Sequence, residues 1–339
     1  MPWFLDMLLS IIIPLFNEEA VLPALVSRLN LVLDTLQCRA EVILVDDGSR
    51  DQTRALATEI AQRDQRYRLL SLTRNFGHQA ALTAGLDWAD GDAVLIIDGD
   101  LQDPPELLSQ MLALYEQGFD VVSAQRSSRE GDALWKRAGI SAFYWITRKA
   151  VDERMVPEVG DFRLLSRSAI LALRQFREQH RFMRGLIAWL GLKEAVVPYR
   201  RNARVAGTSK YPALSLVAFA WTAVTSFSAL PLRLTVLAGL GLSLLGGLYF
   251  CYAAYQTLIV KTTLRGWASL VFLQVFFSGA ILLAIGLIGE YLARVYDESK
   301  GRPLYVVRDT VNLRRDAVLA RRVVILEPRE STTEPLDRR

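Results

Sequence analysis

Two aspartates one residue apart, Asp98 and Asp100, have the clearest capacity for chemistry in this chain of 339 residues. They follow an apolar run, 93–97, that is typical of a buried strand. Gly99 between them allows a tight bend and a close approach by a ligand. With Gln102, the two carboxylates offer hard oxygen ligands, which Mg²⁺ or Mn²⁺ takes together with substrate phosphates. A plain turn is the alternative, but the buried strand before the aspartates and the polar run after them favour a metal site.

Basic residues gather at a second place, the segment 200–211. Three arginines, a lysine and several hydroxyl groups share this short stretch with Gly207, just before a long apolar region. Guanidinium and ammonium groups are suited to a doubly charged lipid phosphate, or to closing over a diphosphate. A solvated basic loop is the alternative reading.

The elements that must position these residues alternate between strands and helices. We expect strands at 8–16, 41–45, 68–72, 93–97 and 119–124, with helices at 21–36 and 80–89 between them. This alternation predicts an α/β fold with a doubly wound, mostly parallel sheet. Ligands of such sheets bind outside the carboxyl ends of the strands. The polar clusters at those ends are 14–18, 46–49, 74–77 and 98–103.

Together these clusters resemble those of family 2 glycosyltransferases, which have the GT-A fold. The closest subgroup is the polyprenyl-phosphate glycosyltransferases, which include dolichol-phosphate mannose synthase and the bacterial GtrB and ArnC types. The resemblance covers nearly the whole chain and says little about the sugar. The motifs that carry it are Ile13-Pro14-Leu15-Phe16-Asn17-Glu18, Val45-Asp46-Asp47-Gly48-Ser49, Arg74-Asn75-Phe76-Gly77-His78 and Asp98-Gly99-Asp100-Leu101-Gln102-Asp103-Pro104-Pro105.

The resemblance implies a role for each motif. Pro14, Phe16 and Glu18 would line the nucleoside pocket, and Asp46 or Asp47 would hydrogen-bond uracil or ribose. A turn and helix cap at 46–47, and a simple loop at 75–77, are the alternatives. The expected metal ligands are Asp98, Asp100 and Gln102. The other residues expected to contact donor or acceptor are Asn17, Ser49, Asn75, Gly77, Gln125, Arg126, Arg163 and Ser209.

A further motif, Gly160-Asp161-Phe162-Arg163-Leu164, resembles one in the same subgroup and places Asp161 near the acceptor. Asp161 would act as a general base or as an orienting acceptor for Arg163. We favour orientation, because a phosphate monoester is largely ionised at neutral pH and its oxygen can attack without losing a proton. His78 could serve as a base, but we expect a flanking polar residue, because this chemistry needs no imidazole. The expected catalytic residues are Asp98, Asp100, Asp161, Arg204 and Lys210.

The apolar region contains two stretches without a charge, 234–260 and 267–289, each long enough to cross a bilayer. The loop between them carries Lys261 and Arg265, and the other side carries more basic residues near the span ends. The positive-inside rule therefore places the catalytic domain and both termini in the cytoplasm. Glycines of the first span, at 239, 241, 246 and 247, would permit close helix packing in a homo-oligomer.

These observations divide the chain into a cytoplasmic GT-A domain (1–210), interfacial amphipathic helices (211–230), two transmembrane helices within 231–292 (about 234–260 and 267–290) and a cytoplasmic C-terminal segment (293–339) with a disordered tail. The formal charge of +4 gathers around the spans and suits a membrane surface. No motif for nucleic acid is present. Cys38 and Cys251 are the chain's two cysteines and have no metal or redox spacing.

We therefore expect an integral, two-span protein, in a bacterial inner membrane, that uses Mg²⁺ or Mn²⁺. It would transfer a hexose with inversion from a nucleotide sugar to a polyprenyl phosphate such as undecaprenyl phosphate. Glucose from UDP-glucose is the favoured donor, and mannose from GDP-mannose is the first alternative. The second alternative, a membrane scaffold or lipid carrier without activity, conflicts with the intact carboxylates and basic residues. A polymer synthase is disfavoured because 179–185 lacks the Gln-x-x-Arg-Trp string of processive members of the family.

Overall fold

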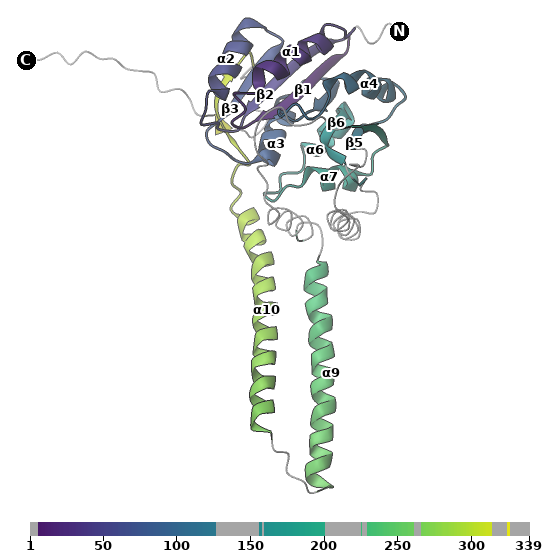
Figure 1. The fold of residues 1–339 in the computed structure, drawn as a ribbon, viewed down its shortest axis with the longest axis vertical. Helices are drawn as coiled ribbons and strands as arrows, with labels where there is room; N and C mark the ends of the chain where they lie inside the picture. The colour runs from purple at the N-terminus through teal and green to yellow at the C-terminus, as the bar shows by residue number, and fades with distance from the viewer. Residues whose placement is uncertain are drawn as a thin grey trace, which may run out of the picture. The chain divides into compact units, whose positions relative to one another are not determined.

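The computed structural model describes residues 6–126, 156–157, 159–200, 225, 229–260, 266–313 and 324–325. They belong to two compact units. The first unit contains residues before 211 and after 302 and is built on a sheet, and the second contains the two long apolar helices (Figure 1).

The strands of the described residues form one mixed sheet in the order β7-β5-β6-β4-β1-β2-β3-β8-β9. Its centre, from β4 through β1 and β2 to β3, is parallel, as the sequence predicts. β6 pairs antiparallel with both β4 and β5, and β8 pairs antiparallel with β3. The strands are β1 (Leu8–Leu15), β2 (Arg39–Asp46), β3 (Tyr67–Leu72), β4 (Ala93–Ile96), β5 (Val121–Arg126), β6 (Val159–Ser166), β7 (Glu194–Tyr199), β8 (Val306–Val311) and β9 (Val324–Ile325).

Helices cover both faces of this sheet, which explains why the central strands read as continuous apolar runs. One face of β1 packs, through Leu9, Ile11 and Ile13, into a core shared with the first, second and fourth helices. On the other face, a Cβ atom at Gly85 would collide with the side chain of Ile12, so α3 lies close against the strand. The helices are α1 (Leu22–Leu33), α2 (Thr53–Arg63), α3 (His78–Trp88), α4 (Leu108–Glu116), α6 (Arg167–Leu173) and α7 (Met183–Leu190).

The chain rejoins the first unit after the apolar helices. There β8 pairs with β3 and extends the sheet. The hydroxyl of Tyr305 donates to Asp87 of α3 at 2.9 Å, and Nδ2 of Asn312 donates to the carbonyl of Tyr67, also at 2.9 Å. The C-terminal segment therefore belongs partly to the sheet and is not a separate region.

The second unit contains α9 (Leu230–Leu258) and α10 (Trp267–Ser299), which lie side by side (Figure 1). Within them, Pro231–Ala253 and Leu273–Ser299 have mean hydropathies of 1.9 and 2.0, and neither is buried. Both are long and apolar enough to cross a membrane. α10 continues past the predicted end of the span at residue 290. A Cβ atom on Gly246 would lie 3.9 Å from Phe277 of α10, so this glycine faces the neighbouring helix.

Candidate active site

The segment that contains Asp98 and Asp100 is a turn. β4 ends at Ile96, and the backbone bends before Leu101, whose φ of +58° lies in the left-handed region. This geometry agrees with the tight bend that Gly99 was expected to allow. The amide of Gln102 donates to Oδ1 of Asp100 at 3.1 Å, and this bond shapes the turn. A Cβ atom at Gly99 would lie 2.9 Å from the side chain of Leu15, so the turn needs glycine there.

The oxygens of this turn fit a hard divalent cation. Oδ1 of Asp98 and Oε1 of Gln102 are both buried, and neither accepts a hydrogen bond. Such oxygens are costly to bury without a partner, and a cation would provide one. Within the described ranges, no group of three or more His, Cys, Asp or Glu side chains is arranged to hold a metal. Because magnesium in proteins is usually held by one or two carboxylates and by substrate phosphates, oxygens of the substrate would complete a cation bound to Asp98, Asp100 and Gln102.

A second group of charged residues adjoins Asp98. Nε2 of His78, the first residue of α3, lies 3.7 Å from Oδ1 of Asp98 and 3.2 Å from Oδ2 of Asp161. Arg184 of α7 binds both oxygens of Asp161, at 2.9 and 3.2 Å. Strands β4 and β6 and helices α3 and α7 thus bring these four residues together from distant parts of the sequence.

The pKa values in this group reflect burial and mutual charge. Burial raises the pKa of Asp98 to about 6. The nearby His78 acts against this shift, and the negative charges of Asp103, Asp161 and Asp100 add to it. Burial lowers the pKa of His78, but its hydrogen bond to Asp161 and the two neighbouring carboxylates raise it to about 9. Burial also disfavours the charged form of Asp161, yet Arg184 and His78 hold its pKa well below the usual range.

The predicted nucleotide motifs meet at the ends of β1, β2 and β3. Ser49 links the first two, because its Oγ accepts from the amide of Asn17 at 3.1 Å and its amide donates to Asp46 at 3.0 Å. Oδ1 of Asn17 accepts from the amide of Arg50 at 2.9 Å. Oδ2 of Asp46 is buried and accepts no hydrogen bond, so this carboxylate keeps an oxygen for a ligand.

Asp47, unlike Asp46, has both carboxylate oxygens bonded to backbone amides. Its Oδ1 accepts from the amide of Phe76 at 2.7 Å, and its Oδ2 accepts from the amide of Gly77 at 3.0 Å. Burial raises the pKa of Asp47, although these two bonds act against the shift. Asp47 therefore holds the loop that leads into α3, and Asp46 is the better candidate for contact with a nucleoside.

Three other predicted residues are placed by the sheet. Nε2 of Gln125 donates to the carbonyl of Pro157 at 3.0 Å, and Nε of Arg126 donates to the hydroxyl of Tyr199 at 3.3 Å. Arg163 is buried and donates through Nη2 to the carbonyl of Gly160 at 2.9 Å. The cations that contact Asp161 include Arg184 and His78.

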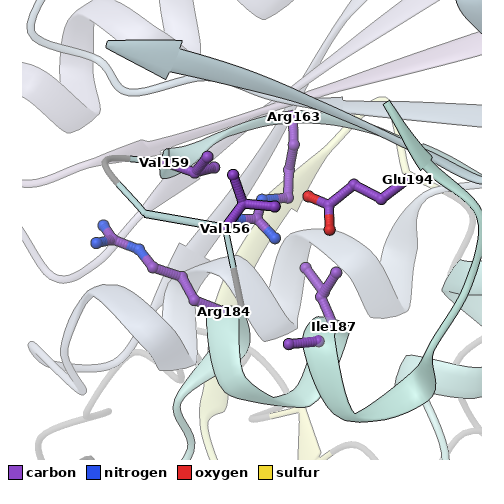
Figure 2. A pocket seen from close by; sticks show the side chains of 7 residues that line it. Val156, Val159, Arg163, Arg184, Ile187 and Glu194 are labelled. Carbon is purple, nitrogen blue, oxygen red and sulfur yellow. The ribbon is translucent and has the colours of Figure 1, made fainter. Parts of the chain in front are cut away.

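Arg163 lines a small pocket between β6, α7 and β7. Figure 2 shows its side chain and that of Glu194 directed into the same space, above Ile187 of α7. Glu194 accepts from the hydroxyl of Ser123 at 2.6 Å. The remaining lining residues are Val156, Val159, Arg184 and Ala188.

Some of the site residues expected from the sequence lie outside the residues that the structure describes. Other residues of the site were not expected from the sequence. Arg204, Ser209 and Lys210 belong to the first group. Tyr199 belongs to the second, because a tyrosine at the end of a strand carries no sequence pattern of its own. The expectation that His78 merely flanks the site was wrong, since it contacts two of the site's carboxylates.

Comparison with known proteins shows similarity to glycosyltransferases. Residues 10–173 match the family model described as glycosyl transferase family 2. The chain is 39% identical over 304 residues to the uncharacterized glycosyltransferase YkcC of Bacillus subtilis, covering 90% of this chain and 94% of that protein. It is 38% identical to the bactoprenol glucosyl transferase of Shigella phage SfV, covering 89% of this chain and 99% of that protein.

A prophage bactoprenol glucosyl transferase homolog of Escherichia coli K12 is 36% identical, with 89% of this chain and 99% of that protein covered. Among solved structures, a glucosyl-3-phosphoglycerate synthase from Mycobacterium tuberculosis is 21% identical with a TM-score of 0.44. The match covers 65% of this chain and 78% of that one.

The predicted fold class, a GT-A α/β domain followed by a hairpin of two apolar helices, is confirmed.

Proposed function

This chain belongs to glycosyl transferase family 2, and on that premise we propose that it transfers glucose from UDP-glucose to a polyprenyl phosphate. The observation that carries the proposal is the similarity, over 89% of the chain, to proteins named bactoprenol glucosyl transferases. The similarity includes the two apolar helices and is not confined to the sheet. A scaffold without activity is disfavoured, because the buried oxygens of Asp98 and Gln102 need a ligand.

The reaction joins a phosphate oxygen of the lipid to C1 of glucose and breaks the bond from C1 to the diphosphate of UDP. The products are glucosyl polyprenyl phosphate and UDP, with inversion at C1. The attacking oxygen is already ionised near neutral pH, so no side chain needs to remove a proton from it. Mg²⁺ or Mn²⁺, when bound, would stabilise negative charge on the departing diphosphate.

The residues of this chain bind and orient the reactants. Asp46, Ser49 and Asn17 lie where the nucleoside would enter, and Asp47 shapes the adjoining loop at the start of α3. A helix N-terminus attracts anionic groups, so this loop is suited to the diphosphate or the sugar. Asp98, Asp100 and Gln102 would hold the cation.

Positively charged side chains lie where the lipid acceptor would bind. His78 and Arg184 are fixed by Asp161, next to the metal-binding turn. Arg204, Ser209 and Lys210 would add the contacts to the lipid phosphate that the basic segment offers. Positive charge on this side favours both the approaching phosphate and the charge that develops on the leaving group.

α9 and α10 would span the membrane and leave the catalytic unit and both termini in the cytoplasm. Basic residues near the inner ends of the spans, Arg233, Arg294, Lys300, Arg302 and Arg308, outnumber Lys261 and Arg265 in the loop between them. A lipid-borne acceptor would thus be reached at the cytoplasmic leaflet.

A donor panel tests the proposed function. Purified protein in detergent receives undecaprenyl phosphate, Mg²⁺ or Mn²⁺, and one labelled nucleotide sugar at a time. We expect labelled lipid with UDP-glucose, and a loss of at least a hundredfold in Asp100→Ala. Equal or faster transfer from GDP-mannose would replace the donor assignment. Absence of labelled lipid with every common nucleotide sugar would overturn the enzyme assignment.

A further inference from the structure

The metal-binding turn is followed by a carboxylate that the proposed function does not use. Asp103 has no exposed surface, and its Oδ1 accepts a hydrogen bond from the hydroxyl of Tyr199. Tyr199 is the last residue of β7, nearly a hundred positions later, and it is 6% exposed. A buried carboxylate needs such donors, because burial without them is strongly unfavourable.

Tyr199 makes two further contacts, one with Arg126 and one with Phe162. Nε of Arg126, the last residue of β5, donates to its hydroxyl at 3.3 Å. The ring of Phe162 meets the ring of Tyr199 edge to face, with centroids 5.9 Å apart and an interplanar angle of 89°. A Cβ atom on Gly160 would lie 2.9 Å from Nη2 of Arg126, so glycine leaves room for the guanidinium. The hydroxyl is thus aimed at Asp103 by β5, β6 and β7 together.

The turn that Asp103 terminates has an unfavourable backbone. Leu101 adopts a φ of +58°, a region that residues with a Cβ atom rarely occupy. Such a conformation persists where the surroundings determine it. On one side the buried side chain of Leu101 anchors the turn in the core, and on the other side Asp103 is bound to Tyr199. Of the three expected metal ligands, Gln102 lies between these fixed points, and Asp98 and Asp100 lie directly before Leu101.

We propose that Asp103 and Tyr199, supported by Arg126, are positioning residues that hold the turn 98–102 in the shape that presents its oxygens to a divalent cation. The inference rests on the proposed function, since the cation and the diphosphate are the ligands for which the turn is shaped. Asp103 acts through the backbone of the turn and does not touch the cation. Loss of the Tyr199 hydroxyl therefore weakens metal binding without removing a ligand.

Matched tyrosine variants test this role. Tyr199→Phe removes the donor to Asp103. Tyr67→Phe removes the hydroxyl of another buried tyrosine. That hydroxyl donates to Asn30 at 2.8 Å, and Tyr67 begins β3, away from the strand ends that form the site. Titration calorimetry measures the dissociation constant of Mn²⁺ in the presence of UDP. We expect about a tenfold increase for Tyr199→Phe, the size of one hydrogen bond to a charged group, and less than about twofold for Tyr67→Phe.

A third variant separates positioning from ligation. Asp103→Asn keeps an oxygen that can accept from Tyr199 but removes the charge. If Asp103 positions the turn, Asp103→Asn weakens Mn²⁺ binding no more than Tyr199→Phe does. If Asp103→Asn abolishes binding while Tyr199→Phe leaves it intact, Asp103 is a metal ligand and the proposal is overturned.

Hydrogen exchange supplies a measurement that does not depend on the ligand. In Tyr199→Phe we expect the amides of 99–103 to exchange at least about fivefold faster, with those of β1 and β2 unchanged. Unchanged exchange at 99–103, or faster exchange across the whole sheet, would overturn the positioning role. If the unaltered protein binds neither Mn²⁺ nor UDP, the proposed function fails, and exchange at 99–103 still decides whether Tyr199 holds the turn.

Discussion

Oδ2 of Asp161 lies 3.2 Å from Nε2 of His78, although 83 positions separate the two residues in the chain. Arg184 binds the same carboxylate from α7. Both oxygens of Asp161 are therefore engaged by cations, and its pKa is held well below the usual range. A carboxylate in this state is a poor proton acceptor and a good anchor for the two cations beside it.

The first prediction concerns Asp161→Asn. We expect kcat/KM for the lipid acceptor to fall by about ten- to a hundredfold, because His78 and Arg184 lose the charge that fixes them. A general base contributes about a hundred- to ten-thousandfold. Steady-state kinetics with UDP-glucose and polyprenyl phosphate measure the change. A decrease beyond about a thousandfold in kcat, with the KM for the lipid unchanged, would instead identify Asp161 as a base.

The second prediction separates Asp46 from Asp47. Asp46→Asn should weaken UDP binding directly, by about tenfold, while leaving thermal stability nearly unchanged. Asp47→Asn should destabilise the protein by about 1–3 kcal/mol, because an amide group would then face the amides of Phe76 and Gly77. Calorimetric binding of UDP and thermal unfolding measure the two effects. The opposite pattern would assign the nucleoside contact to Asp47.

The third prediction concerns the segment that returns to the sheet after α10. Asp87 is 1% exposed, is paired with Arg177 at 2.7 and 2.9 Å, and accepts from Tyr305 at 2.9 Å. Tyr305→Phe removes a buried bond to a charged group and should destabilise the protein by about 1.5–3 kcal/mol.

The control for Tyr305→Phe is Tyr115→Phe, which removes an exposed hydroxyl that donates to the carbonyl of Asp92 at 3.3 Å. Its effect should be within about 0.5 kcal/mol. Thermal unfolding of the full chain measures both variants. Equal losses would show that the contact between Tyr305 and Asp87 adds nothing to stability.

The fourth prediction concerns topology. In a variant without Cys38 and Cys251, Thr263→Cys should react with a membrane-impermeant thiol reagent added to intact spheroplasts. Arg302→Cys should react only after the membrane is permeabilised, since basic residues near the span ends mark the cytoplasmic side. Reaction at both positions, or at Arg302→Cys alone, in intact spheroplasts would contradict the two-span arrangement.

Much of the fold could be predicted from the sequence, because helices cover both faces of its central strands. β1, β2 and β4 are therefore apolar along most of their length, and each ends at a polar cluster. The antiparallel pairing of β6 with β4 and β5 could not be predicted, because a buried strand reads the same in either direction.

The candidate site was only partly predictable for a similar reason. Motifs mark Asp98, Asp100 and Asp46, whose neighbours along the chain complete a recognisable pattern. The partners of Asp161 and Asp103 are Arg184 and Tyr199, which reach them only through the packing of α7 and β7. Such contacts cannot be inferred from sequence spacing, because the partners lie on segments far apart in the chain.

The most direct test of the account compares two acceptors that differ only in their phosphate. Purified protein receives labelled UDP-glucose, Mn²⁺ and either undecaprenyl phosphate or undecaprenol, with Asp98→Asn as the inactive control. We predict that label enters the lipid only with undecaprenyl phosphate, that UDP is released in equal amount, and that Asp98→Asn forms no labelled lipid. Equal labelling of the alcohol, or labelled lipid formed by Asp98→Asn at the rate of the unaltered protein, would contradict the account.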